Sequence, residues 1–133
     1  MAEIGEKQAQ LLTSKNLGHF ATLHGDGSPH LTVVWVDWDG ENVLVNTAVG
    51  RAKERHLRRD PRAGIEVLDP QDPYNYVSVS GPVELVEGPE AEDHIDKLAQ
   101  RYVGVDKYPS RSPGERRVIV KLRPERVYYP GSG

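Results

Sequence analysis

The sequence contains no cysteine among its 133 residues. This absence excludes disulfides, thiolate catalysis and cysteine-bound zinc or iron–sulfur centres, so any redox chemistry has to come from a bound cofactor. No run approaches the ~18 consecutive apolar residues of a membrane span. The polar N-terminus, MAEIGEKQAQ, lacks the pattern of a signal peptide. We therefore expect a cytoplasmic protein with no membrane partner.

The sequence also lacks an internal repeat, a low-complexity tract and a linker between two halves. A chain of 133 residues is long enough to bury one core and too short to bury two. We therefore predict a single domain over residues 1–133.

Alternation of apolar and polar residues predicts a mainly β fold with short helices. Asp39-Gly40 is a typical hairpin turn, and Pro82 predicts a bulge or an edge position in its strand. Six strands joined mostly by hairpins favour antiparallel pairing in a small closed or half-closed barrel, which hides their edges. The predicted strands are 17–23, 30–38, 42–48, 62–68, 74–87 and 118–127, and the predicted helices are 5–15, about 50–60, and one that begins after Gly88-Pro89.

The strand predicted at 30–38 is apolar on both faces. Leu31, Val33 and Trp35 share one face, and the alternate residues Thr32, Val34, Val36 and Trp38 share the other. One face can pack on the barrel core. The other has to be covered by a helix of the same chain, by a partner subunit or by a flat ligand, and the sequence leaves these alternatives open.

The net charge of −3 is unevenly distributed. Residues 51–62 carry six cations against two carboxylates, which leaves −7 for the rest of the chain. An acidic protein with one basic segment is not expected to bind nucleic acid over a broad face, and the pattern indicates a local anion site instead.

The basic segment begins where a strand passes into a helix. A helix N-terminus suits phosphate because its first N–H groups are unpaired. Gly50 lets the backbone turn there, and we expect Thr47, Arg51 and Lys53 to converge on one phosphate. The remaining arginines, at 55, 58, 59 and 62, exceed what one phosphate needs. They indicate either a longer polyanionic tail or a solvated helix face.

Other candidate catalytic groups are weaker. The histidines at 19, 24, 30, 56 and 94 show no metal-ligand spacing, so we predict no metal site, although His19 and His30 could meet across a hairpin. Turn chemistry explains Asp37 and Asp39 better than acid–base catalysis does. Ser78 has no histidine or acid at an informative spacing, so we predict no hydrolase triad and name no catalytic residue.

These residues resemble a known family. The segments GSPHLTVVW, TAVGRAKERHLRRDP, YVSVSGPVELV and a helix ending in QRYVG occur in the order found in the pyridoxamine 5′-phosphate oxidase-like split β-barrel proteins, which bind flavins or deazaflavins. The stretch GRAKERHLRRDPRAGI looks closest to the actinobacterial branch that uses coenzyme F-420. The resemblance covers nearly the whole chain and implies a homodimeric six-stranded antiparallel split barrel with a cofactor at the subunit interface.

The resemblance also implies site residues. Lys53 matches the phosphate-binding lysine of the family, but the true oxidases have an arginine directly before it, where this chain has Ala52. The C-terminal substrate signature of those oxidases is also absent, which argues against pyridoxamine phosphate oxidation. The implied cofactor-binding residues are Thr32, Val33, Val34, Trp35, Asn46, Thr47, Ala48, Arg51, Ala52, Lys53, Arg55 and Ser78.

We therefore predict a coenzyme F-420-dependent reductase that transfers hydride to an unsaturated, conjugated small molecule. The surplus cations suit a cofactor with a phosphate and a glutamate tail better than FMN, whose single phosphate needs fewer. Two alternatives remain: an FMN-dependent reductase or oxidase of the same fold, and a non-catalytic flavin or tetrapyrrole carrier.

Overall fold

The computed structural model describes residues 3–130. Within this range the periodic apolar residues form eight strands and three helices. The helices are α1 (Glu6–Thr13), α2 (Ala52–Arg59) and α3 (Pro89–Val103). The strands are β1 (Leu17–Leu23), β2 (Pro29–Trp35), β3 (Asp37–Trp38), β4 (Val43–Ala48), β5 (Arg62–Asp69), β6 (Asp72–Val86), β7 (Arg117–Leu122) and β8 (Arg126–Tyr128).

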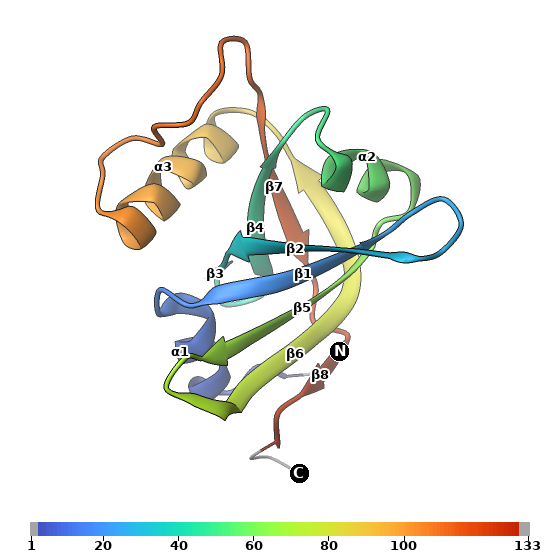
Figure 1. Cartoon of the computed structure of the whole chain (residues 1–133), viewed down its shortest axis with the longest axis vertical. Helices are drawn as coiled ribbons and strands as arrows, with labels where there is room; N and C mark the ends of the chain where they lie inside the picture. Colours follow the sequence, from blue (N-terminus) through green and yellow to red (C-terminus); the bar gives the residue numbers. More distant parts are fainter. Residues whose placement is uncertain (1–2, 131–133) are drawn as a thin grey trace.

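The strands form one antiparallel sheet in the order β2-β1-β5-β6-β7-β4-β3, with β8 paired to β6 (Figure 1). The long strand β6 links the two halves, because its first part pairs with β5 and its last part with β7. Pro82 lies where the partner changes, and the next N–H, that of Val83, bonds the carbonyl of Pro61 at 2.9 Å. A mainly β, antiparallel split barrel with three short helices is thus confirmed.

Two predicted strands are each divided in the structure, which corrects the count from six to eight. The segment 30–38 breaks at Val36, whose N–H donates to the Tyr102 hydroxyl at 3.0 Å instead of to a neighbouring strand. The segment 118–127 breaks at 123–125, where proline removes a backbone donor. This link crosses over Gly81 so closely that a Cβ there would lie 2.1 Å from the Arg123 carbonyl oxygen.

The barrel core contains the inward faces of most strands and two leucines of α1, Leu11 and Leu12. In β6 the alternate residues Val77 and Val79 are fully buried. In α3 one apolar stripe is buried, formed by Ala91, Ile95, Leu98 and Tyr102. Within residues 3–130, no helix combines the length and the apolar composition needed to span a membrane.

The doubly apolar strand β2 is covered on one face only. Val34 and the following Val36 pack in the core, whereas Leu31 is 70% and Val33 60% exposed. Leu17 of β1 lies on the same outer face and is 50% exposed. An intramolecular helix covers only Trp35, whose ring stacks on Tyr102 of α3 at 5.4 Å. Of the alternatives for this face, a helix of the same chain is therefore excluded for Leu31 and Val33.

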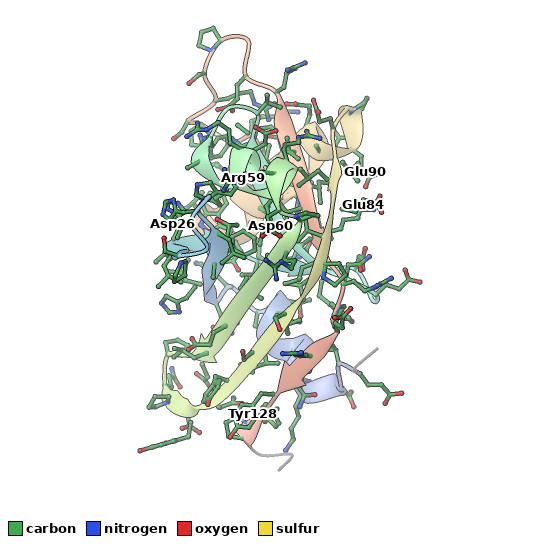
Figure 2. All side chains as sticks on the ribbon, turned by 90° about the vertical axis from the view of Figure 1, so that its right-hand side faces the viewer. Asp26, Arg59, Asp60, Glu84, Glu90 and Tyr128 are labelled. Atoms are coloured by element: carbon green, nitrogen blue, oxygen red, sulfur yellow. The ribbon has the colours of Figure 1, made fainter. Side chains whose placement is uncertain are left out.

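Figure 2 views the molecule from the side of β5 and β6. These two strands run next to each other from the end of α2, marked by Asp60, to the opposite end of the sheet, where Tyr128 marks β8. The basic helix therefore lies at one end of the barrel, and the β5–β6 turn lies at the other.

Candidate functional site

A pocket of about 180 Å³ lies beside the start of α2. β2 and α3 supply its apolar wall, while β4, β7 and the N-terminal end of α2 supply polar and charged groups. The segment 104–116, which arches between α3 and β7 in Figure 1, contributes one aromatic ring. The lining residues are Val33, Val34, Trp35, Asn46, Arg51, Lys53, Ile95, Leu98, Tyr108 and Arg117.

The start of α2 presents two cations to this pocket. Gly50 has a φ of 93°, a left-handed conformation that suits glycine, and Arg51 is the N-cap. Glu54 reaches back from the first turn and accepts the Gly50 N–H at 2.9 Å, which fixes the entry of the helix. With the helix start held in this way, Arg51 and Lys53 both line the pocket.

The pocket is strongly positive. Burial lowers the pKa of Lys53, and the positive charges of Arg51 and Arg117 lower it further. Like charges this close repel one another, and among the described residues one carboxylate, that of Glu115, pairs with the two guanidinium groups, at 3.4 Å from Arg51 and 3.1 Å from Arg117. Such a site favours an anion that contacts all three cations.

Arg117 was missed by the sequence analysis, which began the last strand one residue later. Only 2% of its side chain is exposed, and its guanidinium lies over the Tyr108 ring at 4.9 Å. Its Nε donates to the Asn46 amide oxygen at 2.9 Å. The signal available in the sequence was an arginine directly before an apolar strand, because arginine is seldom buried unless it has a partner or a function. In the structure this strand pairs with β4.

Asn46 connects the pocket to a buried acid. Because its oxygen accepts from Arg117, its amide nitrogen faces His94 Nδ1 at 3.1 Å and donates to it. His94 therefore carries its proton on Nε2, which lies 3.2 Å from Asp37. One continuous hydrogen-bonded chain thus links the pocket arginine to the Asp37 carboxylate.

Asp37 is a structural anion and not a turn residue, which corrects the sequence-based interpretation. Its side chain is 2% exposed and accepts from His94, Lys97 and Arg101 within 3.3 Å. Burial raises its pKa, but the His94 and Trp38 N–H hydrogen bonds and the Arg101 charge outweigh burial and hold the pKa far below its usual range. Only Asp39 performs the expected turn chemistry, accepting two backbone N–H groups at 2.7 and 2.8 Å.

Two predicted ligands point away from the pocket. The side chain of Thr47 is completely buried, on the face of β4 opposite to Asn46, and does not line the pocket. Thr32 likewise lies on the inner face of β2, away from the pocket lining. Both hydroxyls are buried, and neither has a hydrogen-bond partner among the described residues. Of the residues at the end of β4, the pocket is therefore lined by Asn46 and not by Thr47.

The other predicted residues divide into two groups. Val33, Val34, Trp35, Asn46, Arg51 and Lys53 meet at the pocket. Ala48 is buried at the end of β4, Ala52 is the first residue of α2, and neither lines the pocket. Ser78 lies on β6 between Glu66 of β5 and Tyr128 of β8, outside the pocket lining.

The surplus arginines of the basic segment fall into two kinds. Arg58 of α2 pairs with Glu54 and Glu87, and Arg62 at the start of β5 pairs with Asp60, so carboxylates neutralise both. Arg55 and Arg59 of α2 donate instead to the backbone carbonyls of Gly50 and Leu23. Those two form no ion pair with the described residues, although their charges act on Glu54 and Asp60, and they lie on one side of the helix at positions i and i+4.

Three histidines that are far apart in the sequence cluster at the β1–β2 hairpin. The rings of His24, His30 and His56 lie 4.7 to 5.3 Å apart, and His56 hydrogen-bonds with the Thr22 hydroxyl at 2.9 Å. His30 stands opposite Thr22 in the register, so it does not meet His19. The suggested meeting of His19 with His30 is therefore wrong, and His30 meets His24 and His56 instead because α2 folds over the hairpin. Among residues 3–130, no group of three or more His, Asp or Glu side chains is arranged to hold a metal ion.

Replacing His56 by glutamine is expected to reduce the loss of stability on acidification. Burial lowers the pKa of His56 below 6.5, and the neighbouring charges of His24, His30, Arg59 and Arg55 lower it further. The unfolded state therefore binds more protons, so the free energy of unfolding falls as the pH drops below 6.5 towards the folded pKa. Urea unfolding between pH 7 and pH 5 measures this slope, and an equal slope in both proteins would contradict it.

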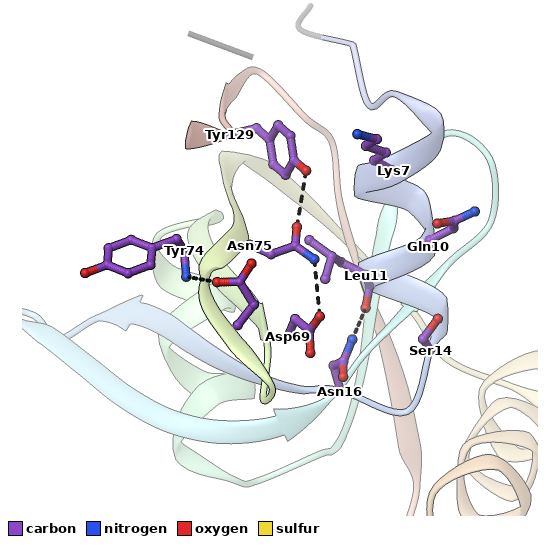
Figure 3. A pocket seen from close by; sticks show the side chains of 10 residues that line it. Lys7, Gln10, Leu11, Ser14, Asn16, Asp69, Tyr74, Asn75 and Tyr129 are labelled. Carbon is purple, nitrogen blue, oxygen red and sulfur yellow. Dashed lines mark hydrogen bonds between the residues drawn. The ribbon is translucent and has the colours of Figure 1, made fainter. Parts of the chain in front are cut away.

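A larger pocket of about 630 Å³ lies at the opposite end of the sheet (Figure 3). It separates α1 from the β5–β6 turn, and its lining includes Lys7, Asp69 and Asp72. Its polar groups are largely satisfied by each other: the Asn75 amide donates to Asp69, and its oxygen accepts from Tyr129 at 3.2 Å. With one cation against two carboxylates, it does not suit an anionic cofactor, so we place the functional site at the smaller pocket.

Comparison with known proteins shows the family to which the chain belongs. The family model described as pyridoxamine 5′-phosphate oxidase matches residues 4–130. A solved F420 reductase is similar at 33% identity, covering 94% of this chain and 98% of that chain with a TM-score of 0.79. A conserved hypothetical protein from Mycobacterium tuberculosis is 30% identical over 94% of this chain and 83% of its own, with a TM-score of 0.73. A heme-binding protein from Mycobacterium smegmatis is 25% identical over 96% of this chain and 54% of its own, with a TM-score of 0.65.

Proposed function

This chain belongs to the pyridoxamine 5′-phosphate oxidase family, and from that premise we propose that it is an oxidoreductase that uses the deazaflavin coenzyme F-420. The reduced coenzyme, when bound, supplies a hydride to an unsaturated, conjugated small molecule. The likeness to an F420 reductase over nearly the whole of both chains supports the deazaflavin in preference to FMN. The chain contains no cysteine, which agrees with chemistry carried by a cofactor.

The observation that carries the proposal is the convergence of three cations on a pocket with an apolar wall. Arg51, Lys53 and Arg117 meet there with one opposing carboxylate, which suits a phosphate. The adjoining wall from β2 includes Val33 and Trp35, which suit one face of a flat ring system. The role of the protein is to hold the phosphate, orient the ring against the acceptor and exclude water.

Two arginines of α2 suit the tail of this cofactor. Arg55 and Arg59 donate to backbone carbonyls, form no ion pair with any residue in 3–130, and lie on the same helix as Lys53. A chain of glutamates leaving the phosphate can follow them along the helix surface. FMN has no such tail, so these two arginines support the deazaflavin.

We further propose that two copies of the chain associate through the outer face of β1 and β2. Leu17, Leu31 and Val33 expose large apolar side chains on this face. Val33 also lines the pocket, so a second copy on this face would complete the wall of the ring site. The expected result is a dimer in light scattering, and Leu31→Asp, at the most exposed of these positions, should shift it towards monomer.

Side-by-side titration of the purified protein with oxidised F-420 and with FMN tests the cofactor assignment. We expect saturable binding of F-420, followed by fluorescence, and binding of FMN that is at least tenfold weaker. Tight FMN binding without F-420 binding would reject the deazaflavin and favour the flavin enzyme. If reduced F-420 binds but no conjugated acceptor oxidises it, a carrier role replaces catalysis.

A tetrapyrrole carrier is a second candidate, because one histidine lies on the exposed apolar face. His19 Nδ1 is 3.2 Å from Glu66, which leaves Nε2 directed away from that carboxylate, as in imidazoles that ligate metals. Its strand neighbours include Leu17, and Val33 stands opposite it on β2. A Soret band shift on adding haem, lost in His19→Ala, would favour this candidate, and no shift would remove it.

A further inference from the structure

The two arginines of the pocket already share an anion of the chain itself. One oxygen of Glu115 lies 3.4 Å from Arg51, and the other lies 3.1 Å from Arg117. The Glu115 side chain is only 8% exposed, so its charge is poorly screened by solvent. Lys53 has no carboxylate within ion-pair distance among the described residues. Glu115 thus neutralises the two guanidinium groups between which an incoming phosphate would bind.

Glu115 sits at the end of a loop that is tied down elsewhere. In segment 104–116, the backbone N–H of Tyr108 and the Arg111 guanidinium both donate to Asp96 of α3 at 2.9 Å. Beside Glu115, the backbone is anchored as well: the Glu115 N–H donates to Ser112 at 3.1 Å, and the Arg116 carbonyl accepts from the Val49 N–H at 2.9 Å. The Glu115 carboxylate can therefore turn away from the two arginines by side-chain rotation while the loop keeps its attachments.

We propose that Glu115 is an internal competitor for the anion site. It pairs with Arg51 and Arg117 while the pocket holds no phosphate, and a phosphate binds by displacing it. This inference rests on the proposed function, because it assumes that the pocket takes the phosphate of a cofactor. Glu115 thereby determines which anions bind in the pocket. A phosphate that also reaches Lys53 displaces the carboxylate, whereas a weakly held anion does not.

A purely structural role for Glu115 and the competitor role predict opposite changes in anion affinity when the Glu115 charge is removed. If Glu115 only holds Arg51 and Arg117 in position, removing its charge disorders both cations and weakens anion binding. If Glu115 competes with the ligand, removing its charge strengthens binding because the two guanidinium groups are already free. The sign of the change therefore separates the two roles.

Calorimetric titration with inorganic phosphate at low ionic strength tests the proposal on Glu115→Gln. We expect phosphate to bind the variant about tenfold more tightly than the wild type, because one poorly screened opposing charge is removed. Glu90→Gln is the matched control. It removes the same charge from an exposed site at the start of α3, paired with Lys121, and should leave the affinity unchanged.

The outcomes separate this inference from the proposed function. If wild type binds phosphate and Glu115→Gln binds equally or more weakly, the competitor role is wrong while the anion site stands. If neither protein binds phosphate, the anion site and the competitor role both fall.

Hydrogen exchange of the wild-type protein gives a second readout that does not depend on the variant. Added phosphate should increase exchange at the Glu115 amide, which donates to Ser112 at 3.1 Å, because the carboxylate that fixes this residue beside the two arginines is displaced. Slower exchange there would overturn the proposal.

Discussion

Replacing Lys53 by alanine is expected to weaken cofactor binding by about 1.5–3 kcal/mol, roughly 10- to 150-fold in Kd. Lys53 is half-buried in the pocket, and its pKa is lowered by burial and by two neighbouring arginines. A bound phosphate relieves that repulsion and gains a charge-assisted hydrogen bond, both of which the variant loses. Fluorescence titration with F-420 measures the change directly.

Lys7→Ala is the matched control, because Lys7 lines the larger pocket between α1 and the β5–β6 turn. Its replacement should leave the affinity for F-420 unchanged. Unchanged affinity in Lys53→Ala together with a loss in Lys7→Ala would move the cofactor site to the larger pocket.

Asp37→Ala is expected to lower the free energy of unfolding by about 3 kcal/mol at pH 7, the low end for removing one partner of a buried ion pair. The variant leaves the buried imidazole of His94 and the Arg101 guanidinium without their acceptor. Lys97 loses less, since 61% of its side chain is exposed and water can replace the carboxylate.

Urea unfolding at several pH values checks both the size and the origin of this effect. The pKa of Asp37 is lowered in the folded state, so its contribution is complete above the unfolded value of 3.8 and is lost as the pH falls below it. The difference between wild type and variant should therefore shrink below about pH 4. Asp39→Asn is the control, because an amide oxygen can still accept the two turn N–H groups, and it should be nearly neutral. A variant as stable as the wild type at pH 7 would show that the network is not stabilising.

Most strands of this chain can be predicted from the sequence because each face of a strand is either mainly buried or mainly exposed. β6 alternates buried valines with solvent-facing serines, and the turn at Asp39-Gly40 ends one strand and begins another. The divisions at Val36 and Pro124 were not predictable in the same way. At Val36 the break depends on Tyr102, a residue 66 positions away whose hydroxyl takes the place of a strand neighbour.

Only part of the candidate site could be predicted from the sequence. A glycine before a basic helix locates Arg51 and Lys53, because helix starts bind anions wherever they occur. Arg117 reaches the same pocket from β7, and Glu115 in the preceding loop pairs with Arg51 and Arg117 there. The pairing of β7 with β4 brings both residues close to the start of α2. Thr47 was proposed as a phosphate ligand because its hydroxyl lies at the end of a strand, but in β4 this side chain is buried on the face opposite to Asn46.

The histidines and Asp37 illustrate what spacing cannot reveal. His24 and His56 are 32 positions apart in the sequence, and their rings lie 4.7 Å apart only because α2 folds onto the hairpin. Asp37 resembles a turn residue in sequence, yet α3 surrounds it with three donors. Contacts made by a helix that packs across the sheet are not encoded in local periodicity.

A structure of the protein with oxidised F-420 bound is the most direct test of the central claim. We expect the coenzyme phosphate within hydrogen-bond distance of Lys53, Arg51 and Arg117, and the deazaflavin ring against Val33 and Trp35. A phosphate bound between α1 and the β5–β6 turn, or a coenzyme that contacts none of these three cations, would contradict it.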